Sequence, residues 1–589
     1  MLARHRLCLA RNTLVIPNFL DLSWLIVSSF IVSSGGRYTV CMHPAAVRSP
    51  ATVPAQPAPW QNSLWLVLIT ALALFTLLLQ GYHPLAEDGG LYVAGVQYTL
   101  DPALFPHYTL FVTEHLRFSV FAPTLAFLVH ATHLSLAWVL VLTNLFSLWL
   151  TFYAAHKILR RTISNDTAQL AALCLLATFW TLPIAGTSLL LMDPYVTGRS
   201  LSTPLSLLAV AFALDPWPSL NRATLRVPHL RDGFIVAKVG SPLPCALCLI
   251  LAALFHPLMA AYAFGFILIL RLTRLRQRHL AYALLTLSAL ALAAVLHALA
   301  PHESPAIIAA EMSRYYWFLS QWQWFELLGL AGPLAVLAAL LRHFRKQSTT
   351  LNNTAANLCR ANIAIGCIAI LIVLFFAHES SPTHLVARMQ PLRVFLLIYA
   401  IMTLLLGATL TQLALEARQR QRSNTARLAL ATLLVLILLA LAATMFTVQR
   451  NTFPASAHIE LPWLTPRNPW SRAFLWARDN TPNDALFALD AKYVNEDGED
   501  AQTFRATALR SALPDFSKDG GEAAITPALA EQWQQGATAQ INLSTESDNL
   551  RDARLLPLGV TWMVLHSTAS TAHPCPYNNG TIKVCRLAP

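Results

Sequence analysis

The stretch Ala429-Leu-Ala-Thr-Leu-Leu-Val-Leu-Ile-Leu-Leu-Ala-Leu-Ala-Ala-Thr-Met-Phe446 decides the fold of this chain. It contains no charged residue, and about 20 apolar residues in a helix suffice to cross the hydrocarbon core of a bilayer. It is the last of about eleven long apolar stretches, and a polar tail of about 140 residues follows it. The sequence therefore predicts a mainly α, polytopic bundle of transmembrane helices with a small soluble α/β domain at its C-terminal end.

The composition indicates that lipid is the solvent for most of the chain. Hydrophobic residues make up 56% and charged residues 12%, whereas soluble domains carry roughly 25% charged residues. Residues 1–450 hold 30 Lys+Arg against 14 Asp+Glu, and residues 451–589 hold 11 against 15. The positive excess therefore lies in short loops between apolar stretches, where it indicates membrane orientation. A nucleic-acid partner is not expected.

Eleven segments match membrane spans, some of them too short to cross upright. They are 62–81, 134–155, 168–191, 200–214, 243–255, 258–271, 280–300, 324–341, 361–378, 391–414 and 427–447. Basic clusters favour the cytoplasmic face, and here they lie at Lys157–Arg161, Arg222–Lys238, Arg271–Arg278, Arg342–Lys346 and Arg418–Arg427.

Two conditions make this threading consistent. Segment 116–132 lies along the outer face without crossing, and segment 243–271 is a hairpin that turns near His256-Pro257. The acidic loops then lie outside: 82–115, 192–199, 301–323 and 378–388. We expect a multi-pass protein of a bacterial inner (plasma) membrane, with a cytoplasmic N-terminus and an extracytoplasmic C-terminal domain.

Three regions are expected along the chain. Residues 1–60 form a poorly ordered N-terminal region, in which Met42 is the expected translation start; a signal-like segment and an extra span are the alternatives. Residues 61–448 form the transmembrane domain, with an external loop at 82–133. Residues 449–589 form the extracytoplasmic domain.

The C-terminal region has soluble patterning. Residues 468–480 suit a helix that starts near Pro469 and ends before Thr481-Pro482. Short strands are predicted at 485–489, 560–566 and 581–587. The charged stretches Asn495–Asp500 and Lys518–Glu522 predict solvated loops. A small α/β domain is the simplest assembly.

The nine cysteines divide into two kinds. Most lie in or beside apolar stretches, where cysteine is a small buried hydrophobe. Cys575 and Cys585 instead flank Pro-Tyr-Asn-Asn-Gly-Thr in the polar region, and Asn579-Gly580 is a hairpin turn signal. A hairpin there brings the two sulfurs together. A disulfide between them requires an oxidising compartment.

Glu87 and Asp88 follow the first secure span at once, in the string Glu87-Asp-Gly-Gly90. Acids near a membrane surface are uncommon enough to suggest chemistry. A carboxylate there could act as a general base on an acceptor hydroxyl, or the pair could hold a divalent cation through oxygen ligands. A solvated turn is the alternative, because acids followed by Gly-Gly are common in turns.

Two further polar clusters lie at the predicted outer edges. Arg199 could bind phosphate as a bidentate fork, with Asp193 orienting it or accepting a proton. A simple Asp193–Arg199 ion pair is the alternative. His256, at the hairpin tip, could be a ligand or proton carrier, although a hydrogen-bonded histidine at a helix kink is the more common case.

Segment 301–326 adds Arg314 to a dense group of Tyr and Trp residues. Such density marks a membrane-interface belt, or it could line a site for sugar rings or a prenyl chain. Arg388 and Arg393 lie near the outer ends of two later spans. Arg393 is predicted to lie just inside a span, and ionisable groups within a span are functional by default. Together these arginines suit an anionic, lipid-linked phosphate.

The layout resembles the GT-C superfamily of membrane glycosyltransferases, close to protein O-mannosyltransferases and aminoarabinose transferases. A span ending at Gln80-Gly81 is followed by the acids Glu87-Asp88, then by the Pro-containing segment Phe121-Ala-Pro-Thr-Leu-Ala-Phe-Leu-Val, and then by a span ending in Lys157-Ile-Leu-Arg-Arg161. The external domain opens with Trp476-Ala-Arg-Asp-Asn-Thr-Pro-Asn-Asp484-Ala-Leu-Phe. The resemblance covers residues 62–589, through short motifs.

The resemblance implies an inverting transferase. It would move a sugar from a polyprenyl-phosphate donor to an envelope glycan, lipid or protein on the outer face. Asp88 would be the catalytic base, with Glu87 as the other candidate, and the outer arginines would hold the donor phosphate. A transporter or flippase of a lipid-linked or anionic substrate, and a non-catalytic membrane scaffold, are the alternatives. Against transport, the chain shows no internal repeat.

Overall fold

The computed structural model describes residues 59–215, 242–347, 349–421, 423–489 and 501–587. Leu64–Pro589 form one compact unit, and Met1–Ser63 form a second, which is described only from Pro59 onward. The predictions about Met42, the basic cluster Arg222–Lys238 and the acidic run Asn495–Asp500 lie outside the described residues.

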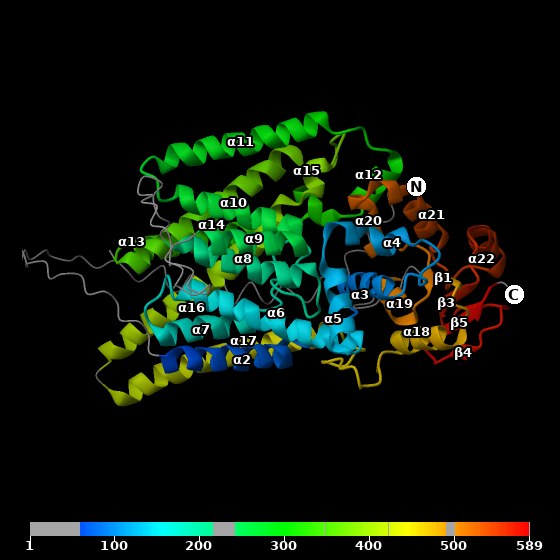
Figure 1. Cartoon of the computed structure of the whole chain (residues 1–589), viewed down its shortest axis with the longest axis horizontal. Helices are drawn as coiled ribbons and strands as arrows, with labels where there is room; N and C mark the ends of the chain where they lie inside the picture. The colour runs from blue at the N-terminus through cyan, green and yellow to red at the C-terminus, as the bar shows by residue number, and fades with distance from the viewer. Residues whose placement is uncertain (1–58, 216–241, 348, 422, 490–500, 588–589) are drawn as a thin grey trace, which may run out of the picture. The chain divides into compact units, whose positions relative to one another are not determined.

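Within these ranges, seven helices are long and apolar enough to cross a membrane. They are α2 (Pro59–Gln80), α6 (Leu136–Leu159), α11 (Arg278–Leu299), α13 (Trp324–Arg345), α14 (Thr350–Phe376), α16 (Phe395–Arg420) and α17 (Asn424–Thr452) (Figure 1). Shorter apolar helices pack among them: α7 (Asp166–Thr178), α8 (Gly198–Leu214), α9 (Leu243–Phe255) and α10 (Pro257–Leu272). The chain is mainly helical, as predicted, with several helices of membrane-spanning length.

The predicted span 168–191 is wrong in its second half. Helix α7 ends at Thr178, and the chain then turns through a loop in which Pro183 pairs with Leu190 in an isolated β-bridge. Pro183 lacks the N–H that a continuing helix needs. The loop is nevertheless apolar because it is buried inside the bundle, with Ile184 fully covered. Hydropathy cannot distinguish such a loop from a span.

Helices α9 and α10 form the predicted hairpin that turns at His256. The Ser202 hydroxyl, near the start of α8, donates to the Ala252 carbonyl at 2.9 Å, near the end of α9. At the other end of α8, Arg271 near the end of α10 donates to the Asp215 carbonyl at 3.3 Å. The hairpin tip therefore lies at the same end of the bundle as the start of α8.

The predicted external loop 82–133 is folded into short helices. They are α3 (Asp88–Leu100), α4 (Leu110–Thr113), the 3₁₀ turn η2 (Glu114–Phe118) and α5 (Phe121–Thr132). At 1.5 Å per residue α5 is about 18 Å long, well short of a bilayer core of about 30 Å. Its length agrees with the prediction that this segment does not cross.

Short elements also fill two later loops, one between α11 and α13 and the other between α14 and α16. Helix α12 (Pro305–Met312) and the 3₁₀ turns η4 (Tyr315–Trp317) and η5 (Leu319–Gln321) lie between α11 and α13. Helix α15 (Leu385–Arg388) and the 3₁₀ turn η6 (Pro391–Val394) lead into α16.

The C-terminal region forms an α/β domain around a five-stranded sheet of order β2-β1-β3-β5-β4. Strands β2, β1 and β3 are parallel, and β3, β5 and β4 are antiparallel. The strands are β1 (Leu486–Leu489), β2 (Ser511–Ala512), β3 (Trp562–His566), β4 (Tyr577–Asn578) and β5 (Ile582–Arg586). The helices are α18 (Pro469–Asn480), α19 (Ala501–Ala508), α20 (Lys518–Ile525), α21 (Ala530–Ala539) and α22 (Asp548–Leu555), with the 3₁₀ turns η8 (Pro527–Leu529) and η9 (Leu556–Leu558).

Both faces of the sheet are covered, because side chains alternate along each strand. In β1, Phe487 packs in a cluster with α18 and α19, whereas Leu486 packs in a second cluster with Leu543 and Leu555. A disulfide joins Cys575, just before β4, to Cys585 in β5, so it links the two sides of the β4–β5 hairpin.

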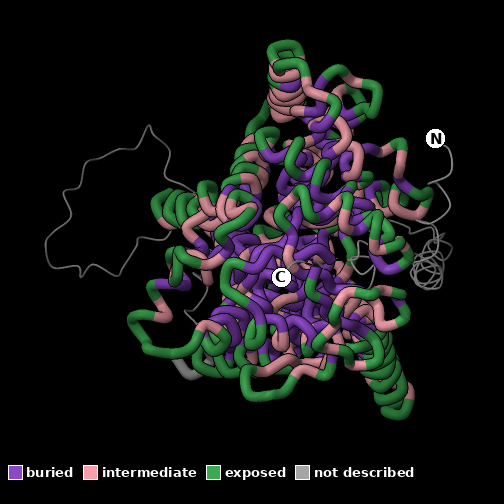
Figure 2. The backbone as a smooth tube through the Cα atoms, turned by 90° about the vertical axis from the view of Figure 1, so that its right-hand side faces the viewer, coloured by how far each residue is buried: buried purple, intermediate pink, exposed green. Residues whose placement is uncertain are grey.

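The domain packs closely on the end of the bundle where α2 finishes. Tyr82 pairs with Ile459 in a parallel β-bridge. The Thr503 hydroxyl donates to the Leu85 carbonyl at 2.7 Å. Buried residues gather at the centre of the molecule and exposed ones on its flanks (Figure 2). We call the end of the bundle that packs against the C-terminal domain the domain end of the bundle.

Candidate functional site

Asp88 is the first residue of α3, at the domain end of the bundle. The preceding residue, Glu87, has φ 50° and ψ −130°, a strained conformation for a residue with a side chain. Asp88 lies 3.5 Å from the Arg199 guanidinium and 3.4 Å from the Lys518 ammonium. Its side chain keeps 37% of its surface exposed, so a ligand can reach it.

Arg199 is placed by the first turn of α8, where Thr197 and Ser200 form a capping box. Its Nε and Nη2 atoms donate to the same Asp193 oxygen, at 3.1 and 2.6 Å. Both side chains are nearly fully buried. The Asp193–Arg199 ion pair, which the sequence left as the alternative to phosphate binding, is present, and it fixes the guanidinium so that Nη2 also faces Asp88.

Lys518 comes from the C-terminal domain and contacts both Glu87 and Asp88. The prediction of a solvated loop at 518–522 is therefore wrong. These residues begin α20, in which Asp519 accepts two hydrogen bonds from Arg505, at 2.8 and 2.9 Å. Because Asp519 pairs with the buried Arg505, its side chain lies inside the domain. The neighbouring Lys518 instead reaches Glu87 and Asp88.

Two acids at this junction are held in opposite protonation states. The partial burial of Asp88 would by itself raise its pKa, but the positive charges of Lys518, Arg199 and Arg393 outweigh this effect and hold that pKa well below its usual range. Burial raises the pKa of Glu522 to about 8, with Asp519, Asp88 and Glu114 adding to the shift. At neutral pH, Asp88 is ionised and Glu522 is protonated.

Arg393 lines a small pocket beside this group. The other lining residues include Thr187, Tyr316, Trp317 and Gln390. The guanidinium of Arg393 lies over the Tyr316 ring, 5.7 Å from its centroid. Three buried polar atoms of the pocket have no hydrogen-bond partner among the described residues: Arg393 Nε, Trp317 Nε1 and Gln390 Oε1. Two donors and an acceptor are thus available to a ligand.

The other predicted residues have structural partners. The Nδ1 atom of His256 accepts from the Met259 N–H at 3.4 Å and caps α10, as expected of a histidine at a helix kink. Arg314 donates to the Phe516 carbonyl at 3.2 Å and so joins the bundle to the C-terminal domain. Arg388 is paired with two buried glutamates, away from Asp88.

The structure therefore brings together Glu87, Asp88, Asp193 and Arg199, with Arg393 close enough to affect the pKa of Asp88. Lys518 and Glu522 complete this group, and the sequence did not indicate either of them. One signal was available. The string Asp-Gly-Gly occurs at 88–90 and again at 519–521, and each copy lies in the first turn of a helix at the junction.

Comparisons with known proteins add no relative. No protein-family model matches the sequence, and a search of curated proteins finds none that is significantly similar.

Proposed function

We propose that this protein is a membrane-embedded glycosyltransferase that moves a sugar from a polyprenyl-phosphate donor to an envelope glycan, lipid or protein. One observation carries the proposal: an ionised, partly exposed carboxylate, Asp88, which contacts Arg199 and Lys518 at the end of a bundle of apolar helices and whose pKa is also lowered by the charge of Arg393. Such a group suits a negatively charged ligand with a long apolar tail. The tail would remain in lipid while the phosphate meets the cations.

The charged residues of the site would each have a role in this reaction. The acceptor hydroxyl attacks the anomeric carbon of the sugar, the bond from that carbon to the phosphate oxygen breaks, and polyprenyl phosphate leaves. Arg199, Arg393 and Lys518 stabilise the negative charge that grows on the leaving phosphate. Asp88 accepts the proton that the acceptor loses.

Binding of the donor would itself activate Asp88. With the charges of Lys518, Arg199 and Arg393 acting on it, the carboxylate has a low pKa and is a weak base. A bound phosphate takes up much of that positive potential, so the pKa of Asp88 rises toward neutrality. The base then becomes effective only when the donor is in place. The small pocket at Arg393 adds two buried donors that have no partner among the described residues, Arg393 Nε and Trp317 Nε1.

The site would face the outside of the cell. At the bundle end opposite the domain, the termini of α6, α10, α13 and α16 carry basic residues such as Lys157, Arg271, Arg345 and Arg418. Basic ends favour the cytoplasmic side, which leaves the domain end extracytoplasmic.

The test compares envelope glycans and glycolipids of a strain that lacks the gene with those of complemented strains. We expect one glycan to lose a sugar on deletion, and wild-type protein to restore it. Asp88→Asn should restore less than a hundredth of the wild-type amount, because a positioned base contributes roughly 10²–10⁴-fold. The matched control is Asp101→Asn, at the exposed far end of the same helix, which should behave as wild type.

Two results would overturn the proposal. If deletion changes no glycan or glycolipid, the protein is no such transferase, and transport or scaffolding becomes the better explanation. If a well-expressed Asp88→Asn variant restores the full profile, Asp88 is not the base.

A further inference from the structure

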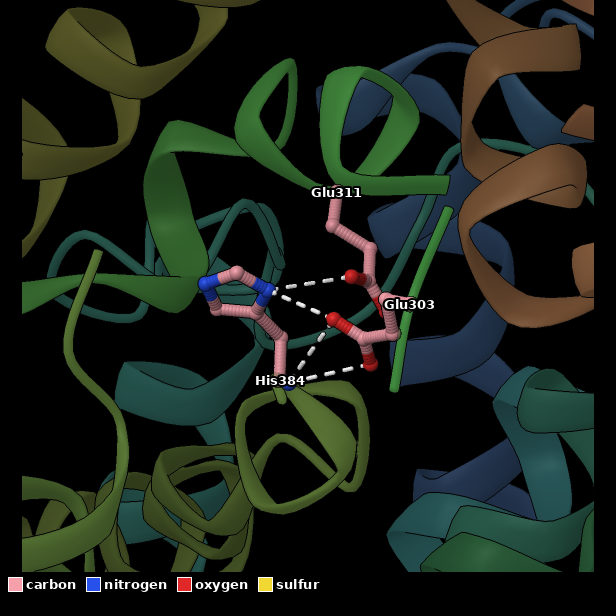
Figure 3. A group of neighbouring side chains, drawn as sticks. All are labelled: Glu303, Glu311 and His384. Atoms are coloured by element: carbon pink, nitrogen blue, oxygen red, sulfur yellow. Dashed lines mark hydrogen bonds and ion pairs between the residues drawn. The ribbon is translucent and has the colours of Figure 1, made fainter. Parts of the chain in front are cut away.

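Three ligand-type side chains converge in a second buried group at the domain end, outside the residues assigned to transfer. Glu303 precedes α12, Glu311 lies in α12, and His384 immediately precedes α15. Figure 3 shows both carboxylates directed at one nitrogen of the imidazole: Nδ1 of His384 lies 2.9 Å from Glu303 Oε2 and 3.1 Å from Glu311 Oε2. All three side chains are at least 95% buried.

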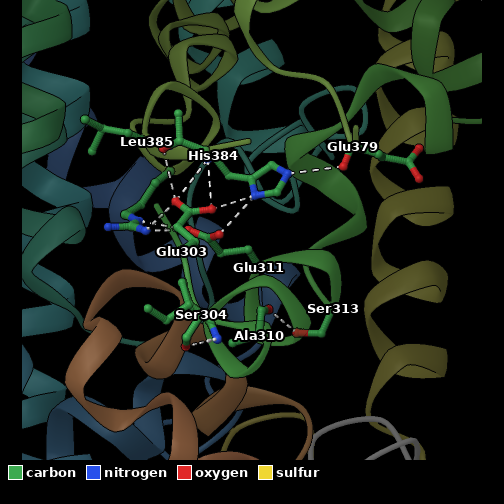
Figure 4. A network of polar contacts seen from close by, with 11 residues as sticks. Glu303, Ser304, Ala310, Glu311, Ser313, Glu379, His384 and Leu385 are labelled. Carbon is green, nitrogen blue, oxygen red and sulfur yellow. Dashed lines mark hydrogen bonds and ion pairs between the residues drawn. The ribbon is translucent and has the colours of Figure 1, made fainter. Parts of the chain in front are cut away.

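The remaining atoms of this group are engaged by the surrounding protein (Figure 4). Arg388 donates to Oε1 of Glu311 at 2.5 and 3.1 Å and to Oε1 of Glu303 at 3.3 Å. Nε2 of His384 lies 3.3 Å from the Glu379 carbonyl oxygen. Each carboxylate therefore uses one oxygen for Arg388 and turns the other toward Nδ1, and both oxygens of Glu303 also accept from the His384 backbone N–H, at 3.0 and 3.1 Å. Metal ligands are commonly held in this way by an outer set of hydrogen bonds, including a backbone carbonyl on the second histidine nitrogen.

We propose that Glu303, Glu311 and His384 bind a divalent transition-series cation, Zn²⁺, Mn²⁺ or Fe²⁺. A single hydrogen on Nδ1 cannot point at two oxygens 2.9 and 3.1 Å away with good geometry for both. One cation, in contrast, can be bound by all three ligand atoms, the imidazole nitrogen and the two carboxylate oxygens. Their potential ligand atoms lie within 4.8 Å of one another. Bonds of about 2.1 Å place neighbouring ligands about 3.0 Å apart at the right angles of an octahedral ion and about 3.4 Å apart at the tetrahedral angles that Zn²⁺ prefers.

The mixed donor set narrows the kind of ion. Two carboxylates and an imidazole nitrogen suit Zn²⁺, Mn²⁺ or Fe²⁺, whereas Ca²⁺ and Mg²⁺ prefer oxygen alone. The two carboxylates carry two negative charges, which Arg388 and a protonated His384 can balance when no metal is bound. A divalent cation would take the place of the proton on His384.

The ion would tie together two loops that are far apart in the sequence. One loop carries α12, which packs against α20 of the C-terminal domain and leads to Arg314. The other leads from His384 to Gln390 and Arg393 in the pocket. The cation would thus fix both loops relative to the domain. Its role is structural, and it does not depend on which reaction occurs at Asp88.

The experiment measures metal in tag-free, full-length protein purified in detergent. We expect mass spectrometry to find about one equivalent of a transition-series cation per chain, and X-ray absorption to show a first shell of nitrogen and oxygen only. Glu311→Gln should lose at least nine-tenths of the metal. The matched control is Glu379→Gln, whose side chain accepts from Ser320 but whose backbone carbonyl still faces His384. It should keep the metal.

A variant that fails to fold would not decide the matter, so the wild-type protein is also stripped with a chelator. Adding Zn²⁺ or Mn²⁺ back should raise its unfolding temperature, and the same addition should leave Glu311→Gln unchanged. The proposal falls if purified wild type holds no metal and neither ion changes its unfolding temperature. A first shell containing sulfur would also overturn it, because the ion would then lie at cysteines.

Discussion

At the scale of single residues, Glu522 is the acid whose titration should be visible in the stability of the protein. Its pKa in the folded chain is raised to about 8, mainly by burial. The folded state therefore holds a proton that the unfolded chain releases near pH 4.5, the ordinary glutamate value. Stability is fully present below that value and declines as the pH rises to about 8.

We predict that Glu522→Gln removes this decline, because glutamine mimics the neutral acid. Between pH 5 and 9, the unfolding temperature of the wild type in detergent should fall more than that of the variant. At pH 9 the variant should be more stable, by on the order of a few kcal/mol. Glu531→Gln, an exposed acid at the start of α21, is the control and should follow the wild type. Parallel curves for all three proteins would show that Glu522 does not titrate in this range.

The residues of the site were predictable from sequence only where the local pattern was unusual. Glu87, Asp88, Asp193 and Arg199 are charged residues at the ends of apolar stretches, so each attracts notice by itself. Lys518 and Glu522 lie in an ordinary charged, glycine-containing stretch that resembles a solvated loop. Their position follows from contacts with residues more than 400 positions away, and the one local signal, the second Asp-Gly-Gly string at 519–521, does not reveal these contacts.

At the scale of elements, α3 and α19 approach each other so closely that no side chain fits between them. A Cβ on Gly90 would lie 2.7 Å from the Thr503 nitrogen and 2.8 Å from the Gln502 carbonyl carbon. These are backbone atoms, which cannot rotate away as the end of a side chain can. This contact places the first turn of α3, and with it Asp88, against the C-terminal domain.

We predict that Gly90→Ala lowers the stability of the protein by about 1–3 kcal/mol, the usual range for overpacking. The C-terminal domain should also become easier to remove by limited proteolysis. Gly332→Ala in α13 is the control, because nothing lies within 4 Å of the added Cβ. That change should be neutral or stabilising by up to about 1 kcal/mol. Equal protease resistance of the two variants would contradict the importance of the α3–α19 contact.

Elements with a strong periodic or apolar signal were predicted well, and buried loops were not. The helix predicted at 468–480 is observed as Pro469–Asn480, and the three predicted strands are observed as β1, β3 and β5 with shorter bounds. The loop after α7 was wrongly predicted to continue the span, because it is as apolar as a span. Two-residue strands such as β2 depend on their neighbours in the sheet and leave too little sequence to detect.

At the scale of the whole molecule, charge differs between the two ends of the bundle. The acids Asp88, Asp193, Glu303 and Glu311 lie at the domain end, and the basic termini of α6, α10, α13 and α16 lie at the other. If the helices cross a membrane, the positive ends are expected in the cytoplasm. The disulfide Cys575–Cys585 also suits an oxidising compartment for the domain.

We predict that alkaline phosphatase fused after residue 587 is active in cells, and that a green fluorescent protein fused there is dark, since the first needs an oxidising compartment for its disulfides. Fusions after Lys346, at the basic connection between α13 and α14, are the matched control and should give the reverse. Fluorescence from the C-terminal fusion would invert the proposed orientation and with it the side on which the site lies.

The distance in sequence between Asp88 and Lys518 has a consequence for how the protein is made. The two residues are 430 positions apart, although their side chains meet at 3.4 Å. A ribosome adding roughly 5–20 residues per second needs about 20–90 s between them. Throughout that interval every apolar helix can be inserted while the acid still lacks one of its cations. A chain cut short before α20 would contain the whole bundle and yet lack Lys518, so the group around Asp88 can be complete only in a nearly full-length chain.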